Sequence, residues 1–419
     1  MGVPETTQPT RPAFPWLGLV ILAVASFVSI TSEFLPTGLL PQMADGLGVS
    51  ESRIGLLVSV FAATVVLTAA PLAALTVRFP RKHLVMVVLV AYALTNVLCA
   101  IAPNFEVMLF ARVLGGVANG LFWAVVGAYT AHLVSGPQLA RAVAVTGTGG
   151  ALAFILGVPV GTAVGQALGW RSAFTIVAIA VLVLIVLIAL FLPAVNHRPT
   201  LATGEIPLPA KRDPSLRAVL LLCLITTVLI TGQNIFYTFI VPFFTTAAGF
   251  PPAAVAPLLL GYGLGGAAGL AIVGLVGHRY PLGGLLVGFG VVALAVLLMG
   301  VFPLVSWVVI LAVLLWGAAI GGAPALLQTR LLAIVSVRLR DVSSAYMATS
   351  FNIGIGGGAL IGSILHDAFG VGVLPFVDIA FIALGLLLIV LTDRITSGTH
   401  NRPVTERHEG WRQNVRPVD

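Results

Sequence analysis

The stretch WLGLVILAVASFVSITSEFLPTGLL, Trp16–Leu40, decides the class of fold. Apart from Glu33 it contains no charged side chain. A helix crosses the hydrocarbon core of a bilayer with roughly 20 mostly apolar residues, so this stretch is predicted to span a membrane. No small-residue cleavage site separates it from the next apolar segment, and we therefore expect a retained first helix and not a signal peptide.

The composition of the whole chain also indicates that the protein is embedded in lipid. Of its 419 residues, 59% are hydrophobic and 8% are charged, whereas a soluble domain has roughly 25% charged residues. The bases are spread between apolar segments, which argues against nucleic acid as a partner. Cys99 and Cys223 lie inside apolar runs, so we expect no disulfide framework, no metal site and no cofactor.

Twelve apolar segments are long enough to span a bilayer. They lie near 16–40, 54–77, 84–102, 107–131, 142–165 and 172–193, and then near 217–247, 254–277, 282–302, 305–328, 343–365 and 372–392. We predict an all-α membrane protein with 12 transmembrane helices in two pseudo-symmetric six-helix bundles. The expected parts are a tail (1–15), a first bundle (16–193), a polar linker (194–215), a second bundle (216–392) and a second tail (393–419).

The positions of Lys and Arg predict the orientation, because short cytoplasmic loops carry an excess of these residues. With both termini in the cytoplasm, only Arg53 and Arg171 face outside. The inside then receives the remaining loop bases: Arg11, Arg78, Arg81, Lys82, Arg141, the linker bases, Arg217, Arg279, Arg330, Arg338, Arg340, Arg394 and the basic second tail. We expect a multi-pass protein of a bacterial inner membrane.

The second half of the chain repeats the first at a constant offset of 201 residues. The matching pairs include Pro41 and Pro242, Gly48 and Gly249, Arg78 and Arg279, Gly116 and Gly317, and Gly169 and Gly370. An offset of six helices gives both halves the same orientation, with a pseudo-twofold axis along the membrane normal. This architecture favours a secondary transporter. The residue clusters of a membrane enzyme and the charge rings or carbonyl filter of a channel are not visible in the sequence.

Three strings resemble one known family. They are TSEFLPTGLLP (Thr31–Pro41), ARVLGGVANGLFW (Ala111–Trp123) and LGVPVGTAVGQALGWRSAF (Leu156–Phe174), with a weaker echo in FNIGIGGGALIG (Phe351–Gly362). The chain resembles the major facilitator superfamily, and within it the bacterial drug:proton antiporters, which include sugar, arabinose, purine nucleoside and chloramphenicol exporters. The resemblance implies that fold for nearly the whole chain, a small-molecule substrate, protons as the coupling ion and a monomer.

The loop between the second and third spans departs from the family pattern. The family's G-x-x-x-D-R-x-G-R-[RK] stands here as AALTVRFPRK. Arg78, Arg81 and Lys82 are kept, but Val77 replaces the acidic residue and Pro80 replaces the second glycine. The three bases are candidates for gating, although a solvated basic loop fits this altered motif better.

Three charged residues are candidates for proton coupling. A carboxylate inside a span costs about 2.5 to 3.5 kcal/mol on insertion scales, so Glu33 is expected to be functional unless it lies near the headgroups beside Pro36. A rise of 1.5 Å per residue puts Glu33 about 10 Å, and Arg112 about 7.5 Å, below the same interface, so the two could form an ion pair. The resemblance implicates Arg112 in proton transfer. Asp378 is also intramembrane, but the resemblance makes its helix peripheral and favours a structural role.

Small and polar residues complete the predicted site. Gly157, Pro159 and Gly161 resemble the antiporter motif of the fifth span, where glycines allow close packing, proline bends the helix and the motif itself favours export. Candidate substrate contacts are the amide and aromatic residues of spans expected to line a cavity: Asn119, Phe122, Trp123, Gln233, Asn234, Tyr237 and Asn352. Interhelical hydrogen bonding and interfacial anchoring are the alternative roles for these side chains.

The sequence therefore predicts a proton-driven exporter of small, largely uncharged amphiphilic molecules, and not an enzyme. Two alternatives remain open. One is uptake or facilitated diffusion of a sugar or nucleoside, and the other is a membrane sensor that has kept the fold without transporting. The identity of the substrate does not follow from the sequence, because related exporters carry chemically unlike molecules.

Overall fold

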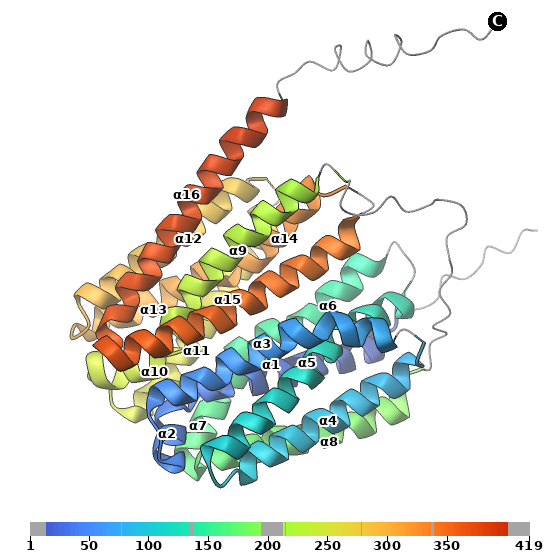
Figure 1. Ribbon diagram of the computed structural model, residues 1–419, viewed down its shortest axis with the longest axis horizontal. Helices are drawn as coiled ribbons and strands as arrows, with labels where there is room; N and C mark the ends of the chain where they lie inside the picture. The colour runs from blue at the N-terminus through green and yellow to red at the C-terminus, as the bar shows by residue number, and fades with distance from the viewer. Residues whose placement is uncertain are drawn as a thin grey trace, which may run out of the picture.

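The computed structural model describes residues 14–76, 78–134, 138–193, 213, 215–277, 279–336 and 339–400. Within these ranges the chain is almost entirely helical and contains no strand (Figure 1). Twelve of its helical segments are long and apolar enough to cross a membrane. The predicted fold class is confirmed. The predicted linker and first tail lie almost wholly outside the described residues, whereas residues 393–400 of the predicted second tail continue the last helix and its remainder lies outside them.

The first half contains six of the spanning segments. Its elements are α1 (Trp16–Gly38), α2 (Leu40–Leu47), α3 (Glu51–Thr76), α4 (Arg81–Ile101), α5 (Phe105–Leu133), α6 (Leu139–Leu152), the π-helical turn η2 (Ala153–Gly157), α7 (Val158–Leu168) and α8 (Trp170–Phe191). The fifth span runs through α6, η2 and α7. Pro159 is the second residue after η2, and because proline has no N–H to donate, the helix cannot keep its regular hydrogen bonding there.

The second half contains the other six spanning segments. Its elements are α9 (Leu216–Tyr237), α10 (Ile240–Pro242), η4 (Phe243–Ala247), α11 (Pro252–Val276), α12 (Pro281–Val301), α13 (Ser306–Gly321), α14 (Ala323–Ile334), α15 (Arg340–Phe369), η6 (Val371–Val373) and α16 (Leu374–His400). The prediction of one helix over 217–247 was too long. The chain breaks after Tyr237, three residues before the short helix that contains Pro242.

The backbone of the two halves repeats at the same offset as the sequence. The described residues with positive φ are all glycines, and they form two pairs separated by 201 residues. Gly48 (φ 65°) corresponds to Gly249 (φ 69°), and Gly169 (φ 85°) corresponds to Gly370 (φ 79°). Glycine enters this region without the steric penalty of a Cβ. Equivalent left-handed turns at equivalent positions support the duplication.

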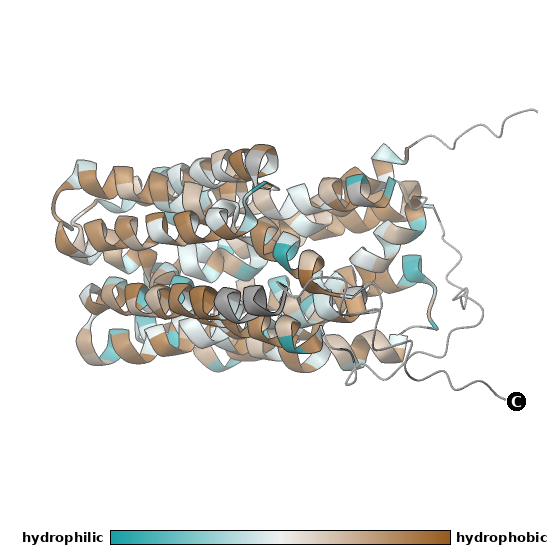
Figure 2. Cartoon of the chain, turned by 90° about the horizontal axis from the view of Figure 1, so that it is seen from above, coloured by the Kyte–Doolittle hydropathy of each residue, from teal (hydrophilic) through white to brown (hydrophobic). Residues whose placement is uncertain are grey.

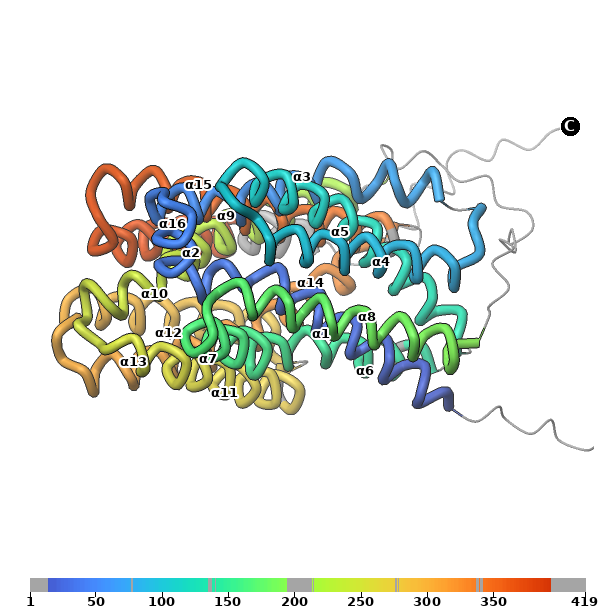
Figure 3. Tube along the Cα trace, turned by 90° about the horizontal axis from the view of Figure 1, so that it is seen from below, coloured from blue at the N-terminus to red at the C-terminus, as the bar shows by residue number. Residues whose placement is uncertain are grey.

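The helices lie side by side, and the molecule has two ends. We call the end where α8 stops at Phe191 and α9 starts at Leu216 the linker face, and the end where α3 starts at Glu51 and α15 stops at Phe369 the opposite face (Figure 3). Apolar residues cover most of the outer helix surfaces (Figure 2). Leu67, for example, is 73% exposed on α3, as expected for a side chain in contact with lipid.

Candidate functional site

The first element of the site is the part of α1 around Pro36, which we call the bend because a proline inside a helix disturbs its axis and its hydrogen bonds. Because proline has no N–H, the carbonyl of Ser32, four residues earlier, loses its helical donor. Arg112 of α5 replaces it, since its Nη1 donates to the Ser32 carbonyl at 3.0 Å and its Nη2 donates to the Glu33 carbonyl at 2.8 Å. Arg112 is 2% exposed. A buried guanidinium therefore joins α5 to the bend of α1.

The predicted ion pair between Glu33 and Arg112 is not formed. Among the residues that the structure describes, the Glu33 carboxylate accepts from Nδ2 of Asn119 at 3.3 Å, and no ion pair links it to Arg112. The guanidinium lies over the ring of Phe61, 4.2 Å from its centroid. The prediction from helix depth could not include the backbone carbonyls beside Pro36, which bind the guanidinium instead.

Further polar side chains connect to the Glu33 carboxylate. Ser29 donates to Oδ1 of Asn119 at 2.8 Å, and the hydroxyl of Tyr92 on α4 donates to the Ser29 carbonyl at 3.1 Å. Ser32 donates to Oδ1 of Asn96 at 2.8 Å. We call Ser29, Ser32, Glu33, Tyr92, Asn96, Arg112 and Asn119 the carboxyl network. Tyr92 and Asn96 were not predicted from the sequence, although two polar residues one turn apart in an apolar span were a usable signal.

Two predicted substrate contacts lie beside this network. Phe122 is 1% exposed and packs against Tyr92, with 6.5 Å between ring centroids. Trp123 packs against Phe122 at 5.5 Å and is 40% exposed. Phe122 therefore belongs to the interior of the first half, whereas Trp123 reaches its surface.

An aromatic cluster joins the two halves. Tyr237 of α9 has its ring centroid 5.1 Å from that of Tyr262 on α11 and 6.0 Å from that of Trp316 on α13. It also contacts two rings of the first half, Phe34 at 6.2 Å and Phe154 at 6.4 Å. We call these five residues the bridging cluster. Tyr237 was predicted from the sequence but the other four were not, because aromatic side chains in apolar spans carry no signal that separates core from site.

Gln233 fixes one side of the bridging cluster. Its Oε1 accepts from the indole Nε1 of Trp316 at 2.7 Å, and its Nε2 donates to the hydroxyl of Tyr262 at 3.1 Å. The other two amides are not brought to the cluster. Asn234 donates to the carbonyl of Ile230 at 2.9 Å, and Asn352 donates to that of Ala348 at 3.0 Å, so each binds its own helix.

Asp378 lies on α16 and is completely buried. Neither of its carboxylate oxygens has a hydrogen-bond partner in the described part of the chain. The side chain packs against α9 at Gly232, where a Cβ would lie 3.0 Å from its Oδ1. Asp378 is thus next to the residue that precedes Gln233, closer to the bridging cluster than a peripheral helix suggests.

The glycines of the fifth span lie against α1. A Cβ at Gly157 would overlap the hydroxyl of Thr31, and one at Gly161 would lie 2.5 Å from Cδ1 of Leu35. This close approach brings η2, with Phe154, to the part of α1 that carries Phe34.

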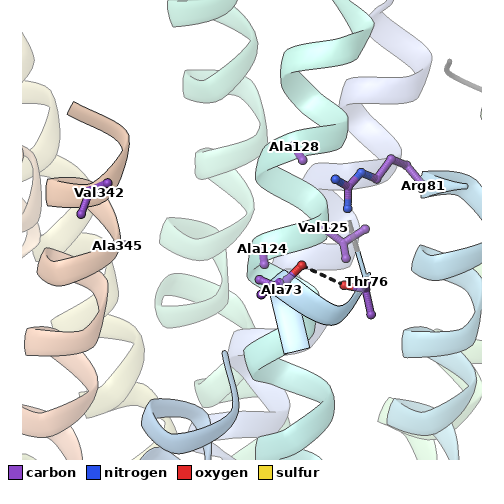
Figure 4. A pocket seen from close by; sticks show the side chains of 9 residues that line it. Ala73, Thr76, Arg81, Ala124, Val125, Ala128, Val342 and Ala345 are labelled. Carbon is purple, nitrogen blue, oxygen red and sulfur yellow. Dashed lines mark hydrogen bonds between the residues drawn. The ribbon is translucent and has the colours of Figure 1, made fainter. Parts of the chain in front are cut away.

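A cavity of about 650 Å³ lies at the linker face. Its lining comes from both halves: Ala73, Ala74, Thr76, Arg81, Ala124, Val125 and Ala128 from the first, Val342 and Ala345 from the second (Figure 4). Of the three predicted gating bases, Arg81 lines this cavity. Lys82 donates to the carbonyl of Ala189 at 2.9 Å, and Arg78 is exposed.

At the opposite face the two halves contact each other. His366 of α15 and Glu51 of α3 lie 2.9 Å apart, measured from Nε2 to Oε2. Gln166 of α7 donates to the carbonyl of Pro252 on α11 at 2.9 Å. The helices α3 and α15 thus contact each other at the opposite face, and both contribute residues to the lining of the cavity at the linker face.

Residues 22–347 match the family model of the Major Facilitator Superfamily, and the chain belongs to this family of membrane transporters. It is 30% identical over 383 residues to a "Probable sugar efflux transporter" of Helicobacter pylori (strain G27), covering 91% of this chain and 96% of that one. Two solved structures share the fold. One is a bacterial homolog of the human lysosomal transporter Spinster (TM-score 0.70, 17% identity, 91% of this chain and 98% of that one), and the other is the human organic anion transporter MFSD10 (TM-score 0.65, 18% identity, 91% and 100%).

Proposed function

We propose that this transporter exports small, largely uncharged amphiphilic molecules in exchange for protons, by alternating access. The observation that carries the proposal is the position of Glu33. It is a buried carboxyl group within the carboxyl network, and the next residue, Phe34, belongs to the bridging cluster between the halves. A change of protonation at Glu33 therefore acts one residue away from the contact that must break when the halves move.

The proton-coupled step uses the two groups that could bind the carboxylate. In the described conformation Glu33 is bound by Asn119 and Arg112 is bound by the carbonyls of the bend. In the alternative conformation the carboxylate pairs with Arg112, and protonation releases it. A neutral acid costs less to bury than a carboxylate. The transporter with protonated Glu33 therefore returns to the conformation that is open at the linker face. Substrate and proton then exclude each other.

The bridging cluster supports an uncharged or sugar-like substrate. Its five aromatic rings provide apolar faces, and Gln233 adds an amide beside them. Among the predicted substrate contacts, Gln233 and Tyr237 take this role, whereas Asn234 and Asn352 bind their own helices. The sugar efflux name of the H. pylori relative supports both the substrate class and the outward direction.

We propose further that the linker face is cytoplasmic, that the membrane is the bacterial inner membrane, and that the transporter is a monomer. The excess of bases on the linker face supports the orientation. With this orientation the cavity beside Arg81 lies on the cytoplasmic side and the contact between Glu51 and His366 lies on the outer side.

Transport by the purified protein in liposomes tests this function. Vesicles with an acidic interior and labelled pentoses, hexoses and nucleosides outside should accumulate one class of probe, and a protonophore should abolish the accumulation. Equilibration of a probe without dependence on the pH gradient would favour facilitated diffusion. Uptake that requires protons to move in the same direction as the probe would favour an importer. No movement of any probe, together with a folded protein, would favour a sensor.

A further inference from the structure

The contact between Glu51 and His366 joins residues that are far apart in the chain and on different halves. Glu51 lies in the first turn of α3 and His366 in the last turn of α15. Their side chains are 27% and 16% exposed. Both positions suit the charges, because a helix N-terminus favours an anion and a C-terminus favours a cation. The partly exposed pair therefore lies at the opposite face, away from the cavity at the linker face.

The surrounding packing holds the imidazole in place. The ring of His366 lies 4.9 Å from that of Phe239, and a Cβ at Gly55 would lie 2.5 Å from Phe239 and 2.7 Å from Ser363. The second ring nitrogen, Nδ1, is buried and has no hydrogen-bond partner among the described residues. Nε2 is thus the nitrogen that the fold presents to the other half.

We propose that Glu51 and His366 form a pH-sensitive latch that holds the opposite face closed. A neutral imidazole gives one ordinary hydrogen bond, whereas an imidazolium facing a carboxylate gives a charge-assisted bond of about twice the strength. Imidazole groups ordinarily change charge between about pH 5 and 8. Acid on the opposite face therefore strengthens the latch, and alkali weakens it.

Other charged groups lie near Glu51 and His366. On the packed helices these are Asp367, which follows His366, and Arg53, which pairs with Glu106 of α5 at 3.6 Å. Asp45 lies on α2, which packs against α3, and Asp378 lies deeper, on α16. Among these groups His366 carries the imidazole, the side chain whose charge ordinarily changes between about pH 5 and 8.

The direction of this response fits the transport cycle, and that part of the inference rests on the proposed function. Under this proposal, acid at the open opposite face makes closure of His366 onto Glu51 more favourable. The proton excess that drives exchange thus also promotes the return to the conformation open at the linker face. The proton on His366 is not carried across, because the latch never meets the linker side. Both residues are positioning residues and do not bind substrate.

Distance measurements between two spin labels test the latch without substrate or gradient. The labels are placed at Leu168→Cys and Ala368→Cys, exposed on the opposite face of each half, with Cys99 and Cys223 replaced by Ala. Raising the pH from about 5.5 to 8, across the range in which imidazole titrates, should increase the fraction with the opposite face open. Exposed ion pairs are weak, so the open-to-closed ratio should change up to about five-fold.

Three variants assign the response. His366→Gln and Glu51→Gln should each remove it, and the double variant should behave like either single one. His132→Gln, an exposed histidine at the linker end of α5, is the matched control and should keep it. A pH response that persists in either Glu51→Gln or His366→Gln, or that disappears in His132→Gln, would overturn the latch. Because no transport is measured, this result is independent of whether the protein exports in exchange for protons.

Discussion

Arg112 binds the backbone of Glu33, through a hydrogen bond of 2.8 Å to its carbonyl oxygen, and not its carboxylate. In the described conformation, therefore, the attachment of α5 to the bend of α1 does not use the carboxyl group. The buried base thus attaches α5 to the bend, and under the proposed function it also pairs with the Glu33 carboxylate in the alternative conformation. Its absence would leave the Ser32 carbonyl, which Pro36 deprives of its helical donor, without a partner.

Replacing Arg112 by Lys should therefore damage the protein although the charge is kept. A single ammonium group cannot reproduce the two parallel N–H donors of a guanidinium. We expect a loss of about 1.5 to 3 kcal/mol of stability, the range for hydrogen bonds to charged groups, and a strong loss of transport. Thermal unfolding in detergent measures the first. Arg53→Lys, on the exposed opposite face, is the control and should unfold like the parent protein.

Pro36→Ala should reduce the dependence on Arg112. Alanine restores an N–H that can donate to the Ser32 carbonyl, so the guanidinium loses part of its role. We expect Arg112→Ala to cost at least about 0.5 kcal/mol less in the Pro36→Ala background than in the parent protein. A double-mutant cycle by thermal unfolding measures the difference. Equal costs in both backgrounds would show that the bend does not recruit Arg112.

Gly157→Ala should destabilise the first half. The new methyl group would overlap the hydroxyl of Thr31 on α1, and overpacking typically costs about 1 to 3 kcal/mol. Gly147→Ala in the same span is the matched control, because nothing lies within 4 Å of its added Cβ. That change should be neutral or stabilising, since alanine favours helix by about 1 kcal/mol over glycine. Similar unfolding temperatures for the two variants would contradict the predicted contact.

Trp316→Phe should weaken substrate binding more than folding. The variant keeps an aromatic ring beside Tyr237 but removes the indole N–H that donates to Gln233 at 2.7 Å. The amide oxygen of Gln233 is then unpaired, which costs about 1 to 3 kcal/mol if it stays buried. Under the proposed function a polar substrate binds that amide, so the KM for the transported probe should rise. An unchanged KM with lower stability would make the bridging cluster purely structural.

The orientation can be tested with an impermeant thiol reagent on intact inner-membrane preparations of known sidedness. A cysteine at Leu168, on the opposite face, should react from the outside. One at Ser397 should react only after the membrane is opened, as the distribution of bases predicts. The reverse pattern would place the linker face outside and invert the proposed direction of transport.

The fold could be predicted because apolar length is a direct requirement of the bilayer. The geometry of the protein interior was harder to predict from the sequence. The break after Tyr237 and the π-helical turns depend on Pro242 and Pro159 in their packed surroundings. Glu33 and Arg112 were found because charge inside a span is costly, but their partners depend on which backbone carbonyls are free. Tyr262 and Trp316 were missed since only the packing of α11 and α13 brings them to Gln233.

The central claim is that Glu33 couples protons to transport, and Glu33→Gln tests it most directly. Glutamine keeps an acceptor for Asn119 and removes the titratable group. In liposomes with an imposed pH gradient, the variant should still exchange a transported probe down its own gradient but should not concentrate it, whereas Glu106→Gln, at the exposed pair with Arg53, should concentrate it normally. Full pH-driven accumulation by Glu33→Gln would contradict this role and move the coupling site to Asp378.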